Sequence, residues 1–488
     1  MSTGPEILKL DWRSLLVALA IGGGANAGLA READAAGGVP PCLECVALRL
    51  ERPIVVRGPS RHEPDAPVSV IRLPDGSFRG FSSGGTTLAM DGANPIAALQ
   101  GPGRTVLAPG PPNSGADCGR WITSILNGLG SFYGLIHNET RCGDPHGSYK
   151  TMSIAKSTDY GLTWNVLGTI ITTDQPNAPH SEGEGDCTGI DGHNGYWYAY
   201  CLRRRDGKNV VARAPIENPA PGKWFKWTES GWNAPGVGGT GAGLSGSVGM
   251  SAAYWSGPDV VLVLGAMHSS LQLSLSEDKV HFGAVADPVI LYDEYNWQRP
   301  APTELYAYPS MIAADRGFND IADHFFLAYM YVPPNEGFSQ RYLVLQEGRI
   351  SASARPQSPQ VRTALSRWID ADGGTWTTTG PAIADGHSYT YDKTIGYLMT
   401  AAPQRGASVK LDECYSDLSG IGFLADTGHC AAEGSERRRP AGYAFRDAEP
   451  GTIALFDCVS TAGEAFVSNR GDCENKGSGA VLLGYALR

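Results

Sequence analysis

The chain has 488 residues, a formal net charge of −11 and no basic run, so it cannot neutralise a line of phosphates, which excludes nucleic-acid binding. Its 63 glycines, 33 prolines, 20 tyrosines and 11 tryptophans suit many short strands joined by tight turns. Long helical periodicity is hard to find after residue 40. The composition therefore predicts an all-β protein.

Residues 1–35 are predicted to be a secretory signal peptide. Lys9 and Arg13 precede the apolar run "SLLVALAIGGGANAGLA", which is too short and too rich in glycine to span a bilayer. Small residues follow at Ala-Asn-Ala (25–27) and Ala-Asp-Ala (33–35), where cleavage is expected. The mature chain would then be secreted or periplasmic, with no contact to a membrane. An uncleaved anchor or tail is the alternative.

The ten cysteines indicate an oxidising compartment, because their spacing suits local disulfides. Cys42 and Cys45 form the only CxxC motif, and no second CxxC or pair of histidines completes a zinc site. No metal and no other cofactor is expected. The predicted pairs are Cys187–Cys201, Cys414–Cys430 and Cys458–Cys473, with Cys118–Cys142 as a further pair.

Residues 46–385 are predicted to form one domain built from five repeated modules. Each module contains two strands separated by turn residues such as "PDGS" or "NGLGS", and a second hairpin follows at a similar distance. Two separate β-sandwiches are the rival architecture. The modules occupy residues 65–83, 120–140, 186–202, 247–267 and 308–332.

The second hairpin of the second module contains "STDYGLTW" (157–164). In this turn Asp159 can cap backbone N–H groups, Gly161 can supply a positive φ, and Trp164 can bury its ring beneath the turn. The octapeptide resembles the Asp-box of sialidase-like β-propellers, where it closes the outer hairpin of a blade. That resemblance implies a five-bladed β-propeller, whose last strands would come from 361–380 together with the N-terminal strand around "CVALRLERPIVV".

Residues 386–488 are predicted to form a separate, smaller domain. The pentapeptides "IGYLM", "AGYAF" and "LGYAL" start at 395, 441 and 483, and between them lie two segments that each pair two cysteines around a phenylalanine. This pattern resembles the disulfide-stapled β repeats appended to secreted bacterial hydrolases. It implies a compact trefoil-like accessory domain that could contact a glycan or a cell wall. A domain that only caps the propeller is equally compatible with the pattern.

Three successive modules each place an acid at an end of an apolar strand: Asp65, Glu139 and Asp186. One such acid is commonly a turn cap, but three indicate a shared site, since each charge must be satisfied at a partly buried position. The pattern resembles the five-bladed β-propeller glycoside hydrolases that act on arabinans, xylans and related polymers. The resemblance implies that Asp65 is the general base. Glu139, Glu184 and Asp186 remain candidates for the general acid, with Glu139 assigned first.

Glycoside cleavage needs a carboxylic acid that protonates the leaving oxygen and a carboxylate that activates water on the opposite face. We therefore expect hydrolysis of a polysaccharide or oligosaccharide with inversion, as the resembled family implies. Trp197, Trp255 and Trp297 could form sugar platforms, although such residues are more often part of a core. The expected substrate-binding residues are His137, Asn138, Glu184, His268, Glu304 and Tyr308.

Three other functions remain open. A sialidase would need an Arg-Ile-Pro motif and three arginines around a carboxylate, whereas this chain has "IRLPDG" (71–76) and one good Asp-box. A polysaccharide lyase would use a His or Tyr base together with a cation such as Arg141. A carbohydrate-binding propeller without activity would lack opposed carboxylates. A lyase product absorbs in the ultraviolet, and a lectin releases no product, so product analysis separates these classes.

Overall fold

The computed structural model describes residues 42–59, 64–141, 143, 148–175, 182–247, 249, 251–384, 386–416, 419–430 and 435–488. The predicted signal peptide lies outside these residues. The described residues belong to one compact unit, Pro40–Arg488, in which strands dominate, so the expected all-β fold is confirmed. None of their helices is long and apolar enough to cross a membrane. The helical elements are α1 (Pro95–Gln100) and the 3-10 turns Leu43–Cys45, Phe338–Gln340 and Cys473–Asn475.

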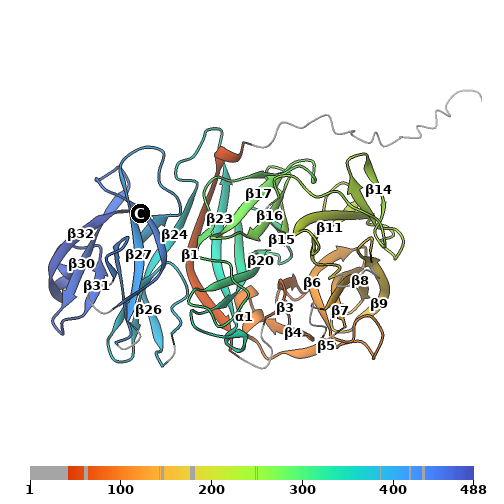
Figure 1. The fold of residues 1–488 in the computed structure, drawn as a ribbon, viewed down its shortest axis with the longest axis horizontal. Coiled ribbons are helices and arrows are strands. Elements are labelled where there is room, and N and C mark those ends of the chain that lie inside the picture. The colour runs from red at the N-terminus through yellow and green to blue at the C-terminus, as the bar shows by residue number, and fades with distance from the viewer. Residues whose placement is uncertain are drawn as a thin grey trace, which may run out of the picture. The chain divides into compact units, whose positions relative to one another are not determined.

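Four sheets form separate blades in a propeller-like arrangement, and their pairings are antiparallel except for that of β15 with β21 (Figure 1). Their hairpins turn at the predicted glycine-rich connections; Gly76 in "PDGS", for example, has a φ of 87°. The four blades contain, in chain order, β2 (Ser69–Arg72), β3 (Phe78–Ser83), β4 (Thr87–Gly92) and β5 (Arg104–Leu107); β6 (Gly119–Gly128), β7 (Ser131–Thr140), β8 (Tyr149–Ser157) and β9 (Asn165–Ile171); β10 (Glu184–Asp191), β11 (Tyr196–Arg203), β12 (Lys208–Pro215), β13 (Phe225–Thr228) and β14 (Gly231–Pro235); β15 (Ser251–Trp255), β16 (Val260–Ala266), β17 (Ser270–Ser276), β18 (Gly283–Ala284), β19 (Ile290–Leu291) and β21 (Asp320–Ile321).

The fifth predicted module does not form a separate blade, which corrects the expectation of five. Its strands β20 (Leu305–Ala313) and β22 (His324–Val332) pair with each other, β22 pairs with β23 (Tyr342–Ala352), and β23 pairs with β1 (Val46–Arg57). The sheet does not end there, because β1 pairs in parallel with β24 (Val361–Asp370) and the sheet continues to thirteen strands. Residues 361–380 thus extend this sheet beyond β1.

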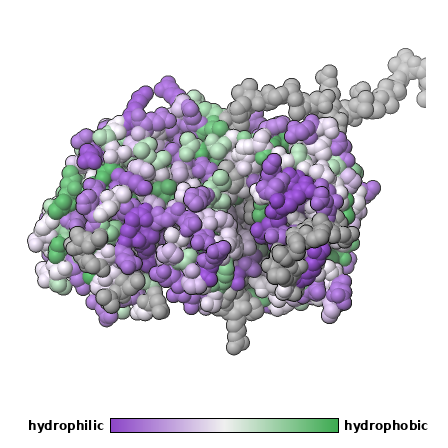
Figure 2. Space-filling model, viewed as in Figure 1, coloured by the Kyte–Doolittle hydropathy of each residue, from purple (hydrophilic) through white to green (hydrophobic). Residues whose placement is uncertain are grey.

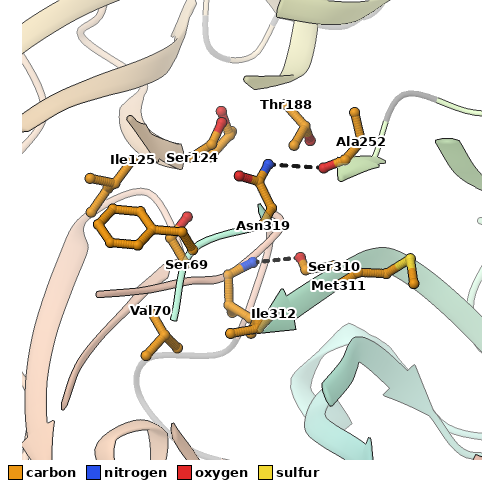
Figure 3. A pocket seen from close by; sticks show the side chains of 13 residues that line it. Ser69, Val70, Ser124, Ile125, Thr188, Ala252, Ser310, Met311, Ile312 and Asn319 are labelled. Carbon is orange, nitrogen blue, oxygen red and sulfur yellow. Dashed lines mark hydrogen bonds between the residues drawn. The ribbon is translucent and has the colours of Figure 1, made fainter. Parts of the chain in front are cut away.

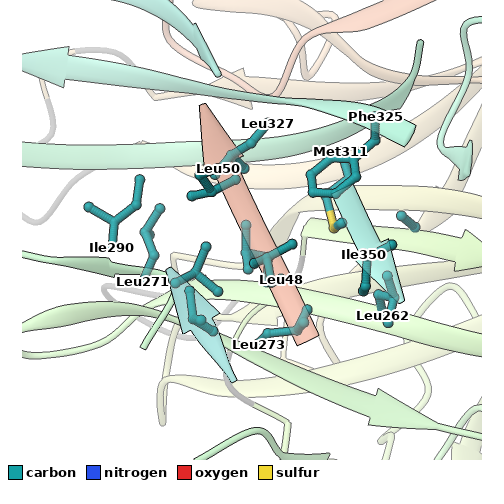
Figure 4. Packing of buried hydrophobic residues seen from close by; sticks show 14 of the residues in the cluster. Leu48, Leu50, Leu262, Leu271, Leu273, Ile290, Met311, Phe325, Leu327 and Ile350 are labelled. Carbon is teal, nitrogen blue, oxygen red and sulfur yellow. The ribbon is translucent and has the colours of Figure 1, made fainter. Parts of the chain in front are cut away.

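The strand β1 is held in place by its alternating side chains. Val46, Leu48 and Leu50 are buried, and the residues between them are only partly buried, as expected for a strand with one face on a core. Leu48 and Leu50 pack in one cluster with Leu271 and Phe325, which belong to β17 and β22 (Figure 4). The N-terminal strand therefore joins two neighbouring sheets through apolar contacts.

The first strands of all five modules meet around one small cavity of about 20 Å³ (Figure 3). Hydroxyl side chains from four of these strands line it: Ser69, Ser124, Thr188 and Ser310. Ser310 Oγ accepts a hydrogen bond of 3.0 Å from the backbone N–H of Val68. A space of this size holds about one water molecule, so it is too small for a sugar, and no channel of that width passes between these strands.

The Asp-box has the predicted structure. Asp159 Oδ1 accepts hydrogen bonds from the backbone N–H groups of Leu162 (3.1 Å) and Thr163 (3.0 Å). Gly161 has a φ of 78°, and its carbonyl accepts a hydrogen bond from the Trp164 indole at 3.0 Å. The box joins β8 to β9, the outer hairpin of its blade. It is a folding element.

The chain from β24 onward forms three units of three strands each. The recurring pentapeptides lie in the third strand of each unit, and the units share one apolar core that includes Leu365, Leu411 and Leu455. The trefoil-like fold is not confirmed by this arrangement. The strands after β24 are β25 (Thr375–Thr378), β26 (Tyr389–Met399), β27 (Ser408–Ser416), β28 (Ile421–Asp426), β29 (Glu436–Phe445), β30 (Thr452–Ser460), β31 (Ala465–Ser468) and β32 (Gly477–Leu487).

The predicted domain boundary at 385 stays a prediction, and strands on its two sides pair with each other. β24 lies before the boundary and pairs antiparallel with β26 after it, from Arg362↔Met399 to Asp370↔Tyr389. The first unit has no cysteine: Trp368 lies opposite Trp376, where the second unit has Cys414 opposite Phe423.

The predicted disulfides Cys187–Cys201, Cys414–Cys430 and Cys458–Cys473 are confirmed. Cys42 and Cys45 form a further disulfide. The predicted partner of Cys118, Cys142, lies outside the described residues. Four disulfides among the described residues are compatible with an extracellular or periplasmic protein.

Polar side chains cover most of the face of the molecule in Figure 2, where apolar residues are scattered. Large apolar side chains such as Trp197, Trp224 and Phe325 are instead fully buried. The interior clusters therefore hold the sheets together.

Candidate active site

The structure brings the three predicted acids close enough together for their charges to interact. Asp65 lies just before β2, where its backbone N–H bonds to Ser83 of β3, Glu139 lies at the end of β7, and Asp186 lies near the start of β10. His137 lies between two of them: its Nε2 is 3.2 Å from Glu139 Oε1, and its Nδ1 is 3.4 Å from Asp186 Oδ1. The charges of Asp186 and Glu139 also act on the pKa of Asp65.

The alternation of β7 decides which of its polar residues reach this site. Side chains two residues apart lie on the same side of a strand, so His137 and Glu139 point together. Asn138 points to the other side, is buried, and donates a hydrogen bond of 2.9 Å to Ser153 Oγ. Of the two predicted substrate-binding residues on this strand, only His137 lies in the cluster.

Asp186 reaches the site through an irregularity of β10. The pairing of β10 with β11 shifts between Gly185 and Thr188, and Asp186 has a φ of 51°, which is uncommon for a residue other than glycine. A Cβ atom on Gly185 would lie 2.7 Å from His137 Nδ1, so the approach requires glycine at this position.

The same irregularity sets the tautomer of His137. The backbone N–H of Asp186 donates a hydrogen bond of 2.9 Å to His137 Nδ1, so this nitrogen is an acceptor. The ring proton then lies on Nε2 and is donated to Glu139.

Each of the three acids has one cation beside it. Arg341 Nη1 is 2.5 Å from Asp65 Oδ1, Arg204 Nη2 is 3.3 Å from Asp186 Oδ2, and Lys150 Nζ is 3.8 Å from Glu139 Oε1. None of these three cations was predicted from the sequence. Arg204 and Lys150 lie at strand ends beside the acids, the same local signal that revealed the acids themselves. Arg341 is 276 residues from Asp65 and has no such signal.

Asp65 and Glu139 have pKa values that are displaced in opposite directions. Burial raises the pKa of Asp65, Arg341 opposes this, and the charges of Asp186 and Glu139 add to it, so the pKa is about 6. Burial alone would also raise the pKa of Glu139, but hydrogen bonds from His137 and Ser148 and the charge of Lys150 lower it to about 2. At neutral pH Glu139 is therefore a fixed anion.

Aromatic side chains form a wall next to the acids. Tyr308 has a φ of 50° in an irregular part of β20, and burial together with the charges of Asp65 and Asp186 raises its pKa well above its usual value. The ring of Trp297 is 5.6 Å from that of Tyr308 and 5.5 Å from that of Phe338. Trp297 is 37% exposed, so its surface is accessible to a ligand.

Trp197 and Trp255 do not belong to this wall. Both are buried, at 0% and 4% exposure, and they pack in apolar clusters between the sheets. They are core residues, as such residues commonly are.

Three other predicted substrate-binding residues lie apart from the cluster. Glu184 is buried and its Oε2 is 2.6 Å from Lys226 Nζ, which is buried as well. Glu304 is buried and faces Arg439 at 3.5 Å. His268 lies in the exposed loop after β16, where its carbonyl accepts a hydrogen bond of 2.8 Å from the Tyr295 backbone N–H.

No group of three or more His, Cys, Asp or Glu side chains within the described ranges has an arrangement that could hold a metal ion. The three acids instead face the side chains of Arg341, Arg204 and Lys150. Carboxyl groups held in this way can donate and accept protons.

The chain matches no protein-family model and no curated protein. Several solved structures of glycoside hydrolases are similar to it. An α-L-arabinofuranosidase of Lactobacillus brevis is 13% identical, with a TM-score of 0.40 over 64% of this chain and 92% of that one. A family 117 glycoside hydrolase of Zobellia galactanivorans is 12% identical, with a TM-score of 0.42 over 63% and 91%. An endo-arabinase of Bacteroides thetaiotaomicron is 11% identical, with a TM-score of 0.38 over 62% and 99%.

Proposed function

We propose that the protein is a glycoside hydrolase that cleaves a polysaccharide, arabinan-like or another extracellular glycan, by paired-carboxylate chemistry with inversion. One observation carries this proposal: Asp65, Glu139 and Asp186 lie in one site, and burial together with the charges of the other two acids raises the pKa of Asp65 to about 6. A carboxyl group whose pKa is displaced in this way beside other carboxylates is typical of a site for acid–base catalysis. The exposed ring of Trp297 beside them supports a sugar substrate.

In this proposal Asp65 is the general base. Above a pH of about 6 it is ionised, and its raised pKa makes it a stronger base than an ordinary carboxylate. A water molecule held by Asp65 would attack the anomeric carbon and transfer its proton to the carboxylate.

Of the three candidates for the general acid, Asp186 fits best. Glu184 is bound to Lys226 in the interior. Glu139 is ionised throughout the neutral range, because its pKa is about 2. Asp186 remains, and it lies in the cluster beside His137 and close enough to Asp65 for their charges to interact. Glu139 is then a positioning residue, which holds His137 against Asp186.

The finer features of the predicted architecture belong to the same proposal. The mature chain would begin after the signal peptide at residue 35 and be exported. The residues after 385 would form a trefoil-like accessory domain with its own contact to glycan.

The decisive experiment incubates residues 36–488 with arabinans, xylans, galactans and cell-wall glycans and identifies the products. We expect new reducing ends with an inverted anomeric configuration in the first nuclear magnetic resonance spectra after mixing. The Asp65→Asn variant should lose at least ~10²-fold in rate. Asp372→Asn, a change at an exposed turn, is the matched control. An unsaturated product that absorbs in the ultraviolet would instead identify a lyase, and binding without any product would identify a lectin.

A further inference from the structure

A groove of about 560 Å³ lies between the loops beside β20, β22 and β23 and the three C-terminal units that begin at β24. One wall comes from the segments before β20 and between β22 and β23, and it contains Pro302, Pro333, Pro334 and Tyr342. The other wall comes from residues around 383–384 and from β27 and β29. Ligand sites have volumes of about 300–1,000 Å³, so this groove is large enough for several sugar units.

The groove and the active site share a loop. In the segment between β22 and β23, Arg341 binds the catalytic Asp65, and its neighbours Gln340 and Tyr342 line the groove. Phe338, in the same segment, stacks against Trp297 of the aromatic wall. The candidate site and the groove therefore lie on two sides of one short segment, which a polymer leaving the aromatic wall would cross to reach the groove.

The chemistry of the lining suits a neutral sugar chain. The proline rings and the Tyr342 ring offer apolar faces to the C–H face of a sugar, and carboxylates and amides offer acceptors to its hydroxyl groups. The exposed lining is mostly polar, which suits the many hydroxyl groups of a sugar chain.

The charges of the groove argue against an acidic polymer. Its two arginines already have partners: Arg437 contacts Asp293 at 2.8 Å, and Arg438 donates to the Ile383 carbonyl at 2.8 Å. Glu336 and Glu436 also line it, and neither forms an ion pair with another described residue. Arg438 keeps its positive charge beside a neutral carbonyl, but Arg437 is offset by Asp293 and Asp412, so with the two glutamates the lining has no net positive charge that would attract a uronate chain.

We infer that this groove is a distal subsite that binds an uncharged polysaccharide chain whose end is held at Asp65 and Asp186. The inference rests on the proposed function, and it assigns the substrate class: a neutral polymer several sugar units long. The C-terminal units thus contribute one wall of the substrate site in addition to any separate contact with glycan.

The test uses Ala384→Trp, which places a large ring in the groove, and Ala448→Trp, an exposed change between β29 and β30, as the matched control. Binding is measured by calorimetry in the Asp65→Asn background with neutral arabinan, galactan and xylan, and with polygalacturonate. We expect Ala384→Trp to weaken binding of the neutral polymer at least ~10-fold, which is ~1.4 kcal/mol. The Ala448→Trp variant should bind it like the parent protein.

Hydrolysis separates this inference from the proposed function. In the otherwise wild-type protein, Ala384→Trp should raise KM for the polymer and leave kcat/KM for a short aryl glycoside unchanged. If no substrate is cleaved but Ala384→Trp still abolishes polymer binding, the proposed hydrolase activity fails and the groove stands. Equal polymer binding in Ala384→Trp and Ala448→Trp, or tighter binding of polygalacturonate than of every neutral polymer, overturns the inference.

Discussion

Two clusters of carboxylates and arginines differ in what surrounds them. In the candidate active site Asp65 is 31% exposed and contacts Arg341, and its pKa is about 6. In the second cluster, between β20 and the C-terminal units, Glu304 and Glu413 are buried around the guanidinium of Arg439. A similar set of groups therefore occurs in two settings: Asp65 keeps part of its surface in contact with solvent, whereas Glu304 and Glu413 are enclosed in the framework.

The buried cluster also shows how its charges are satisfied. Glu413 accepts hydrogen bonds from the Trp376 indole (2.9 Å) and the Thr378 hydroxyl (2.7 Å), and Arg439 donates to the hydroxyl of Tyr306. Every partner is buried, so no group has access to a substrate. The cluster connects the start of β20 to the C-terminal units, and its role is to stabilise the fold.

Removing the central cation should break the buried cluster and give the largest effect. We expect Arg439→Met to lower the free energy of unfolding by about 3–5 kcal/mol, because two buried carboxylates lose their partner. Urea unfolding followed by fluorescence measures this change. Arg470→Met is the control, since its pair with Asp472 lies at the surface, where solvent screens it, and should contribute little to stability. Similar losses in the two variants would contradict the assignment of the buried cluster.

Substitutions of Asp186 and Glu139 should distinguish the roles of these two acids in the candidate active site. We expect Asp186→Asn to lose at least ~10²-fold on natural glycosides and much less on activated aryl glycosides, which do not need a proton on the leaving group. Glu139→Gln should slow both substrate classes by the same factor, because Glu139 positions His137 and donates no proton. Steady-state rates on the two classes provide the measurement. A loss in Glu139→Gln confined to natural glycosides would return the acid role to Glu139.

The pH dependence should report the raised pKa of Asp65. As a general base Asp65 acts only when ionised, so kcat/KM should rise as the pH increases through about 6, and Asp65→Asn should lack this limb. An acidic limb that lies wholly below pH 4 would contradict the role of Asp65.

The same groups affect stability in opposite directions. Asp65 has a raised pKa in the folded protein, so its contribution to stability is fully present below about 3.8 and is lost as the pH rises through about 6. Glu139 has a lowered pKa, so its contribution is present above about 4.5 and is lost as the pH falls through about 2. The difference in unfolding free energy between the wild-type protein and each variant, Asp65→Asn or Glu139→Gln, should show these two opposite slopes across this pH range.

The smallest predicted effect concerns the aromatic wall of the candidate active site. Trp297→Ala should raise KM several-fold, by about 1 kcal/mol of lost contact, and should leave kcat nearly unchanged, since the ring neither donates nor accepts a transferred proton. Trp232→Ala, a change of a partly buried tryptophan in another blade, is the control for general effects on the fold. An equal change of KM in both variants would remove Trp297 from the substrate site.

Local patterns in the sequence were sufficient for several features. The turn residues and the Asp-box predicted the hairpins, and the cysteine spacing predicted three disulfides, because these features depend on residues close together in the chain. The acids at strand ends were also visible, since a charge beside an apolar strand needs a reason.

The sequence did not reveal that the sheet of β20, β22, β23 and β1 continues into the C-terminal units. β1 was expected at the closure of the propeller, and it does pair with β23. Its second edge pairs with β24, which extends the sheet into the C-terminal units. Pairing of a strand edge is decided by which segment lies beside it in space, and the residues of β1 alone do not specify that segment.

Glu184 and Asp186 show most clearly what the sequence determined and what the tertiary structure decided. The sequence placed both acids at the head of one strand, and regular alternation would point them to the same side. The irregularity at Gly185 and Asp186 breaks this alternation, so Glu184 faces Lys226 in the interior and Asp186 faces His137 in the open site. The close contact of Gly185 with a histidine 48 positions earlier favours this bulge, and such a contact exists only when the two blades pack together.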